Sequence, residues 1–248
     1  MTQSISLIIP ALNEQDVILN VLSGIFNAAN SSFDYFEMIL VDDGSSDSTG
    51  GIMDKFAKTY PGIKVIHNES NRGLGASFQI GLGVAQYEYV MLLCGDGGLP
   101  AKSLPKIFSL VGQADVIIPY MENLRSIKSP QRYILSRTYV KTMNLISGFN
   151  LRYYNGLPVY RRALLDEIKV KSSGFGFQAE ILFKLLKSGC TYKEVGVDGA
   201  EETGQSDALR LRNVLSVSRT LTRLMFAIYA FKPIPIDVIT KARQKSKY

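Results

Sequence analysis

The first half of the sequence alternates short apolar runs with segments of helical periodicity, and a polar motif follows each apolar run. Strands are predicted over Ile5–Pro10, Glu37–Val41, Ile63–His67 and Glu88–Leu93. The motifs at their ends read PALNE, DDGSSDST, NESNRGLGAS and CGDGG. Strands that alternate with helices favour a parallel, doubly wound sheet, which binds ligands at the carboxyl ends of its strands. We therefore expect the four motifs to meet at one edge of a sheet.

The helices between these strands are expected over Asp16–Ala28, over Gly51–Thr59 and in a segment that ends near Gln86. The second half is less regular. Strands are predicted there over 115–119 and 192–197, and helices over 130–147, 177–187 and 213–231. The fold class is therefore α/β, with a mostly parallel sheet, helices on both faces and a C-terminal amphipathic helix.

The composition is that of a globular intracellular chain. A hydrophobic fraction of 46% in 248 residues is enough for a sizeable core. Cys94 and Cys190 form no disulfide framework and no CxxC metal pattern, which favours a reducing cytosol. The first residues do not resemble a secretory signal, and no apolar run reaches the roughly 18 residues of a membrane span. We expect His67 and Cys190 to be structural.

Positive charge is concentrated at the C-terminus. Residues 206–248 contain nine Lys or Arg and two Asp, a net charge of +7, whereas the whole chain carries +6. This distribution argues against a protein that binds nucleic acid over its whole surface. Residues 213–231 form an amphipathic pattern with Arg219 and Arg223 on its polar side. This helix either docks on the catalytic domain, lies on an anionic membrane surface or forms an oligomer contact.

Three of the strand ends carry carboxylates that could serve a site. Asp42 and Asp43 either cap the next helix or accept hydrogen bonds from a ligand, and Asn13 and Glu14 likewise either begin a helix or border a site. Asp96 follows a strand and stands in a glycine turn, a pattern that often holds a metal. Metal–diphosphate sites of this kind usually carry two acids that are separated by one residue. Here the first of these two positions is Cys94.

Taken together, these motifs resemble those of the family 2 glycosyltransferases, which have the GT-A fold. The branch with dolichol-phosphate mannose synthase and bacterial polyprenyl-phosphate sugar transferases is the most similar. LIIPALNE, ILVDDGSSDST and NRGLGAS match the family's first three motifs, and CGDGG stands at its Asp-x-Asp motif. The resemblance covers about residues 5–110 strongly. It continues more thinly, through RYILSR, NGLPVYRR and GFGFQAEIL, to about residue 206.

The resemblance implies a site for a UDP- or GDP-linked sugar. Its nucleotide-binding residues would be Pro10, Ala11, Asn13, Glu14, Asp42, Asp43 and Gly73. Asp42 would hold the base or ribose, with Asp43 supporting it. The glycine would let the nucleotide approach the backbone closely. The implied domain spans residues 1–206, with a nucleotide-binding half to about residue 110 and an acceptor half over 111–206. Residues 207–248 would be a basic appendage.

The resemblance also implies catalytic and acceptor residues. Asp96 would bind Mg²⁺ or Mn²⁺, and the thiol of Cys94 would make this site weaker or less selective for a hard cation. Gln178 and Glu180 would lie under the sugar and the acceptor. Arg132, Ser136 and Arg137 would grip the phosphate of a polyprenyl-phosphate acceptor. The implied reaction inverts the anomeric centre, and the enzyme would be cytoplasmic, either free or peripheral at the inner face of the membrane.

The second half departs from the branch pattern. PYMEN replaces its Gly-Ser-Arg-Tyr motif, and Glu201 and Asp207 stand where the branch carries Arg and Lys. Arg125 and Lys128 lie near the first departure. Two alternatives therefore stay open. One is transfer to a sugar hydroxyl in surface-polysaccharide or lipid-linked saccharide synthesis, with an acid such as Glu180 as base. The other is a scaffold that binds a nucleotide-sugar without catalysis. A homo-oligomer is compatible with either.

Overall fold

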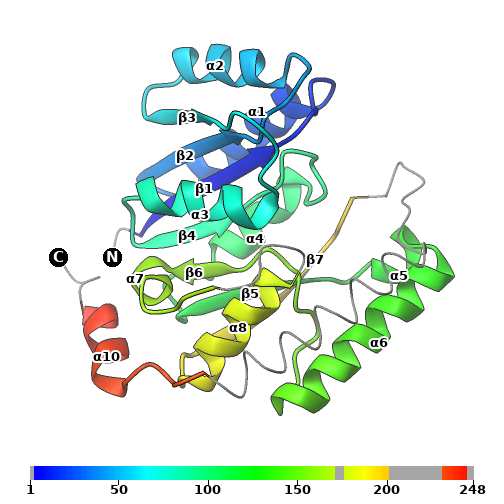
Figure 1. Ribbon diagram of the computed structural model, residues 1–248, viewed down its shortest axis with the longest axis vertical. Coiled ribbons are helices and arrows are strands. Elements are labelled where there is room, and N and C mark those ends of the chain that lie inside the picture. The colour runs from blue at the N-terminus through cyan, green and yellow to red at the C-terminus, as the bar shows by residue number, and fades with distance from the viewer. Residues whose placement is uncertain (1–2, 171–175, 201–230, 245–248) are drawn as a thin grey trace.

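A seven-stranded sheet runs through the computed structural model, which describes residues 3–170, 176–200 and 231–244 (Figure 1). The strands are β1 (Ser4–Ala11), β2 (Tyr35–Asp42), β3 (Ile63–His67), β4 (Tyr89–Leu92), β5 (Val116–Met121), β6 (Val159–Arg161) and β7 (Tyr192–Val197). Their order is β3-β2-β1-β4-β6-β5-β7. β6 runs antiparallel to both neighbours, and the other pairs are parallel. The predicted mostly parallel sheet is confirmed.

Helices cover both faces of the sheet, as predicted. One face packs on α1 (Ile18–Asn30), α2 (Thr49–Thr59) and α4 (Leu104–Phe108). The opposite face packs on α3 (Leu74–Val84), α6 (Pro130–Ser147), α7 (Arg162–Leu165), α8 (Phe177–Lys187) and α10 (Ile236–Gln244). The short segments η1 (Ala101–Ser103) and α5 (Leu124–Ile127) follow β4 and β5 along the chain. The C-terminal helix that was predicted over 213–231 lies almost wholly outside the described residues.

The alternating direction of side chains in a strand explains the apolar runs. In β1, Leu7 and Ile9 enter the core beneath α1 and α2, while Ile8 enters the core beneath α3 and α8. All three side chains are fully buried. A strand that is covered on both faces has no solvent side, and its sequence is therefore apolar at nearly every position.

The first helix begins two residues later than predicted, at Ile18. The preceding loop is held by the loop after β2. The N–H of Gln15 donates to Asp47 Oδ2 at 3.2 Å, and its side-chain Oε1 accepts from the N–H of Ser48 at 3.1 Å. A helix that began at Asp16 would orient the N–H and side chain of Gln15 differently and break these bonds. The chain therefore turns here, and α1 starts only at Ile18.

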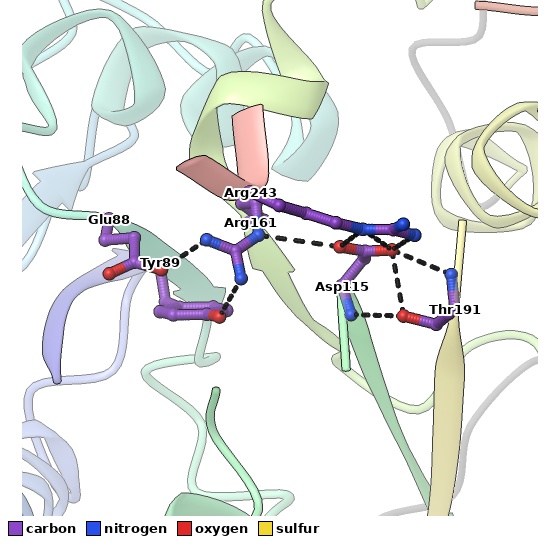
Figure 2. Close-up of polar contacts among 6 residues, drawn as sticks. All are labelled: Glu88, Tyr89, Asp115, Arg161, Thr191 and Arg243. Atoms are coloured by element: carbon purple, nitrogen blue, oxygen red, sulfur yellow. Dashed lines mark hydrogen bonds and ion pairs between the residues drawn. The ribbon is translucent and has the colours of Figure 1, made fainter. Parts of the chain in front are cut away.

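A buried ionic cluster attaches α10, the last described helix, to the sheet (Figure 2). Asp115, whose side chain is 2% exposed, lies 2.5 Å from a guanidinium nitrogen of Arg243 in α10. Its carboxylate also accepts hydrogen bonds from the N–H and the hydroxyl of Thr191, at 2.8 and 2.9 Å. Arg161 lies 3.5 Å from the same carboxylate and pairs on its other side with Glu88. Glu88, Asp115 and Thr191 immediately precede β4, β5 and β7. The cluster thus joins the starts of these three strands to α10.

Apolar contacts complete this attachment. Ile239 and Ala242 of α10 are buried, and the N–H of Ile234 donates to Ser188 Oγ at 2.9 Å. Residues 231–244 therefore pack onto the domain, although they fall within the segment expected to be an appendage. Among the described helices, none is both long and apolar enough to cross a membrane.

Candidate active site

The motifs that follow β1, β2, β3 and β4 meet at the carboxyl edge of the sheet. Backbone bonds continue past the strands: the N–H groups of Asp43 and Gly95 donate to the carbonyl oxygens of Ala11 and Pro10, each at 2.9 Å. The loops enclose a pocket of about 340 Å³. Six of the residues selected from the sequence line it: Pro10, Ala11, Glu14, Asp43, Gly73 and Asp96.

Asp43 forms one wall of this pocket and organises the loop after β3. Its carboxylate accepts hydrogen bonds from Asn68 Nδ2 at 2.8 Å and from the N–H groups of Arg72 and Gly73 at 3.0 and 2.9 Å. Burial acts to raise the pKa of Asp43, but these donors outweigh it and hold the pKa below its usual value. Asp43 is thus a fixed anion that shapes the loop.

Gly73 has a backbone conformation that the loop requires. Its φ is +86°, in the region that side chains disfavour, although a Cβ there would meet nothing within 4 Å. The residue is therefore needed for its backbone angle rather than for space. Gly73 and Leu74, at the start of α3, both line the pocket. The partial positive charge of a helix N-terminus consequently faces the pocket from this side.

Asp42 occupies a different position from Asp43. Its Oδ1 accepts from the N–H of Ser45 at 3.0 Å, and its Oδ2 lies 3.0 Å from His67 Nδ1. Asp42 is buried and is not among the residues that line the pocket. The other ring nitrogen of His67 lies 3.1 Å from Asp54. The structure thus places Asp42 in the contact between β2, β3 and α2.

The His67 contacts predict a pH dependence of stability. Hydrogen bonding to Asp42 raises the pKa of His67 above its ordinary value of 6.5, against a smaller opposing effect of burial. The stabilisation that protonated His67 gains from these contacts is therefore fully present below pH 6.5, and it is lost as the pH rises through the raised pKa of His67. We expect the melting temperature of His67→Gln to fall furthest below wild type near pH 6, with the gap closing at higher pH. A gap that is constant from pH 6 to 9 would contradict this assignment.

Two adjacent glycines in α2 provide a matched test of the packing around Asp42. A Cβ at Gly50 would lie 2.4 Å from Asp42 Oδ2, whereas a Cβ at Gly51 would meet nothing within 4 Å. We expect Gly50→Ala to destabilise the fold by about 1–3 kcal/mol because Asp42 and His67 must move. Gly51→Ala should stabilise it by about 0.5–1 kcal/mol, since alanine favours a helix. Denaturant unfolding of both variants measures the difference, and equal effects would be inconsistent with this packing.

The motif after β1 is tied to the motif after β2. Asn13 has a φ of +56°, its N–H donates to Ser45 Oγ at 3.0 Å and its Oδ1 accepts from the N–H of Ser46 at 2.9 Å. The N–H of Glu14 donates to Thr49 Oγ1 at 2.8 Å. Asn13 is exposed and does not line the pocket, whereas Glu14 does. Burial, followed by the negative charge of Asp96, raises the pKa of Glu14.

The glycine turn after β4 presents Asp96 to the pocket. Gly97 has a φ of +73°, and the N–H of Gly98 donates to Asp96 Oδ1 at 2.9 Å. Cys94 also lines the pocket. Burial, together with the charges of Asp96 and Glu14, raises the pKa of the Cys94 thiol to about 12. This position therefore carries a neutral thiol at physiological pH.

The charges around the pocket are suited to a divalent cation. Glu14, Asp43 and Asp96 line it, and no Lys or Arg is among its lining residues. Within the described ranges, no group of three or more His, Cys, Asp or Glu side chains is arranged to hold a metal by itself. A cation would therefore take part of its ligands from a bound anion, as Mg²⁺ does when it binds through one or two carboxylates and substrate phosphates.

Of the residues assigned to catalysis, Asp96 lines this pocket, whereas Gln178, Glu180 and the acceptor candidates are not among its lining residues. Gln178 and Glu180 are buried in the first turn of α8, and Glu180 lies 2.5 Å from Lys184 Nζ. Phe177 packs against Phe78 of α3 with the ring centroids 5.8 Å apart, which connects α8 to the helix that borders the pocket. The three acceptor candidates, Arg132, Ser136 and Arg137, are on α6.

Asn71 and Leu74 line the pocket but were not singled out from the sequence. Both stand within the NRGLG motif, so the signal was present. The ionic cluster around Asp115 was not predicted either. Its partner Arg243 is 128 residues away in the sequence, and no local pattern connects the two.

The sequence and the fold both match known proteins. A family model described as Glycosyl transferase family 2 matches residues 6–170, about two thirds of the chain. The chain belongs to glycosyl transferase family 2. It is a glycosyltransferase with the GT-A fold, as the motifs implied.

Among the relatives of this glycosyltransferase is the polyprenol monophosphomannose synthase of Mycolicibacterium smegmatis, 27% identical over 81% of this chain and 78% of the relative. The undecaprenyl-phosphate mannosyltransferase of Micrococcus luteus is 28% identical over 80% of this chain and 85% of the relative. A crystal structure of glucosyl-3-phosphoglycerate synthase from Mycobacterium tuberculosis, in complex with Mn²⁺, UDP and glucosyl-3-phosphoglycerate, aligns with a TM-score of 0.66. It shares 18% identity and covers 93% of this chain and 81% of its own.

Proposed function

We propose that this family 2 glycosyltransferase moves a sugar from a UDP- or GDP-linked donor to a polyprenyl phosphate, with inversion at the anomeric carbon. A divalent cation, Mg²⁺ or Mn²⁺, would bind at Asp96. Two relatives whose names specify polyprenol or undecaprenyl phosphate support the acceptor. The structural neighbour crystallised with Mn²⁺ and UDP supports the donor class and the metal.

The charge of the pocket is the observation that carries the proposal. A diphosphate would be repelled by three carboxylates with no cationic side chain among the lining residues. The N-terminus of α3 offsets this only in part, because a helix terminus carries about half an elementary charge. A divalent cation fits between the carboxylates and a diphosphate. When bound, it would neutralise the negative charge that grows on the leaving diphosphate.

The two acids after β2 would have different roles. Because Asp43 lines the pocket and holds the loop at Gly73, we assign it to the donor wall. Because both oxygens of Asp42 are engaged with Ser45 and His67, we assign Asp42 to support of that wall. These roles reverse the ones that the family resemblance implied. Pro10 and Ala11 would contact the nucleotide from the end of β1.

The second half of the chain suits a phosphate acceptor. Residues 123–152 contain six Lys or Arg and no Asp or Glu, and they include α5 and α6 with Arg132, Ser136 and Arg137. A lipid phosphate is ionised at neutral pH, so its oxygen can attack the anomeric carbon without a general base as the bond to the diphosphate oxygen breaks. Gln178 and Glu180 would then shape the floor of the sugar site, with the charge of Glu180 balanced by Lys184.

A transfer assay tests this proposal. The purified chain is incubated with Mn²⁺ and UDP- or GDP-linked hexoses, and with either undecaprenyl phosphate or an oligosaccharide. We expect a lipid-linked monosaccharide from one donor class. Product on the oligosaccharide alone would support transfer to a sugar hydroxyl. Nucleotide binding with no transfer to either acceptor would instead indicate the non-catalytic scaffold.

The proposal includes contact between the C-terminal basic segment and an anionic membrane. Truncation of that segment is a poor test because it would remove Arg243 and leave Asp115 without this partner. Replacing Arg212, Arg219 and Arg223 of that segment together by Ser keeps both Arg243 and Asp115 in the chain. We expect this variant to lose binding to vesicles with anionic lipid in a flotation assay. Equal flotation of the variant and wild type would argue against membrane contact through these residues.

A further inference from the structure

The carboxylates of the pocket differ in how many hydrogen bonds their oxygens accept. Asp43 accepts from three donors, as described above. Asp96 accepts from the N–H of Gly98 at 2.9 Å through Oδ1. The side chain of Glu14 makes no hydrogen bond or ion pair with the residues that the structure describes, although it lines the same pocket. Asp96 and Glu14 therefore have more unused acceptor capacity on their carboxylate oxygens to offer to a ligand than Asp43 has.

The backbone of Glu14 is fixed on both sides. Its N–H donates to Thr49 Oγ1 at 2.8 Å, and its carbonyl oxygen accepts from the N–H groups of Val17 and Ile18 at 3.1 and 2.9 Å. The preceding residue, Asn13, is itself held by the loop after β2. Glu14 thus projects from a rigid junction between β1 and α1, and little backbone entropy would be lost when its carboxylate binds a ligand.

The residue that would normally pair with Asp96 is absent from this chain. The position two residues before Asp96 is Cys94, and a thiol is a poor ligand for the hard cations that accompany phosphates. With Cys94, the turn after β4 offers a cation one carboxylate. A second carboxylate with unengaged oxygens, in the same pocket and on the loop after the adjacent strand β1, restores the missing negative charge.

We propose that Glu14 supplies the second carboxylate of the cation site in this glycosyltransferase, in place of the acid that Cys94 replaces. The inference rests on the proposed cation-dependent donor site and assigns Glu14 a role at the cation rather than at the nucleoside. Glu14 either coordinates the cation directly or receives a hydrogen bond from water bound to it. Both arrangements require its negative charge.

Titration calorimetry with Mn²⁺, at saturating UDP or GDP, tests this role without measuring turnover. We expect Glu14→Gln to weaken the Mn²⁺ affinity by about 10- to 100-fold, the loss typical of groups that support a metal site. Binding of the nucleotide without metal should be unchanged or tighter, because one repelling charge is removed. Adding Cys94→Asp to Glu14→Gln should restore most of the Mn²⁺ affinity. Glu69→Gln, an exposed acid on the loop after β3, is the control and should bind as wild type.

Two results would overturn the assignment. An Mn²⁺ affinity of Glu14→Gln equal to that of wild type would remove Glu14 from the cation site. A loss of nucleotide affinity that is equal with and without Mn²⁺ would show that Glu14 contacts the nucleoside instead. Failure of the proposed function is distinguishable from both, since wild type itself would then bind nucleotide without any effect of Mn²⁺. Thermal unfolding of each variant separates these outcomes from misfolding.

Discussion

Replacing Asp96 by asparagine is expected to lower kcat/KM for sugar transfer by about 10²- to 10³-fold, the usual loss when one preorganised electrostatic contact to a transition state is removed. Asp96 is the acid at the end of β4 that lines the pocket, and the turn at Gly97 and Gly98 fixes it there. The substitution keeps the size of the side chain and its hydrogen bond from Gly98, but removes the charge that a cation requires. The leaving diphosphate then develops its negative charge without compensation.

A fixed-time assay with the natural donor class measures this loss, and Asp16→Asn is the matched control. Asp16 is an exposed acid near the start of α1 and does not line the pocket. Its substitution should leave turnover within about twofold, as surface changes away from a site usually do. If Asp96→Asn kept activity near wild type, the metal role of Asp96 would be wrong. The reaction would then have to proceed with leaving-group stabilisation from elsewhere in the chain.

Replacing Asp115 by asparagine is expected to destabilise the fold by about 3–5 kcal/mol, because it removes the buried anion that pairs with Arg243 and leaves the buried Arg161 with Glu88 as its remaining anion. The Asp115 side chain is 2% exposed, and it receives Arg243 from α10 and the N–H and hydroxyl of Thr191 (Figure 2). Arg161, 8% exposed, lies on its other side. The amide keeps the volume of the carboxylate and can still accept from Thr191, so the loss measures mainly the charge.

Denaturant unfolding of three variants separates this effect from a general one. Arg243→Ala should cost less than Asp115→Asn, since the Arg243 side chain is 38% exposed and Asp115 keeps its other partners. Asp237→Asn removes one acid from an exposed pair with Lys241 in α10 and should change stability by less than about 0.5 kcal/mol. Similar losses for Asp115→Asn and Asp237→Asn would contradict the structural importance of the buried cluster.

The pH dependence gives the Asp115 prediction a second readout. Burial acts to raise the pKa of Asp115, but Arg243 and Thr191 outweigh it and lower the pKa. A lowered pKa contributes stability that is present above the unfolded value of about 3.9 and is lost as the pH falls through the folded pKa. The difference in free energy of unfolding between wild type and Asp115→Asn should therefore be largest near pH 7 and should narrow in acid below about pH 4.

The sequence predicted the donor half of the structure well because the information there is local. Each strand of that half is an apolar run, and the polar residues that line the pocket follow directly after it, as with Asp43 after β2 and Asp96 after β4. The topology of parallel sheets then brings these strand ends together. The long helix Pro130–Ser147 was also predicted with accurate ends.

Other features depended on contacts that no local pattern reveals. The three-residue strand β6 lies within the sequence YNGLPVYRR, which resembles a strand and turn, but its antiparallel direction is set by its pairing with β4 and β5. The sequence does not distinguish Asp42 from Asp43, yet one turns toward His67 and the other toward the pocket. The attachment of α10 joins residues 128 positions apart through Asp115 and Arg243. These features follow from charge and burial in the folded structure rather than from the local sequence.

Calorimetric binding of UDP and GDP to the wild-type chain, with and without Mn²⁺, tests the central claim most directly. The claim is that a pocket lined by Glu14, Asp43 and Asp96 binds a nucleoside diphosphate more tightly together with a divalent cation than without one. We predict that one of the two nucleotides binds about 10-fold tighter or more when Mn²⁺ is present, a difference of about 1.4 kcal/mol or more. Binding that is equally tight with Mn²⁺ and with a chelator would contradict the claim.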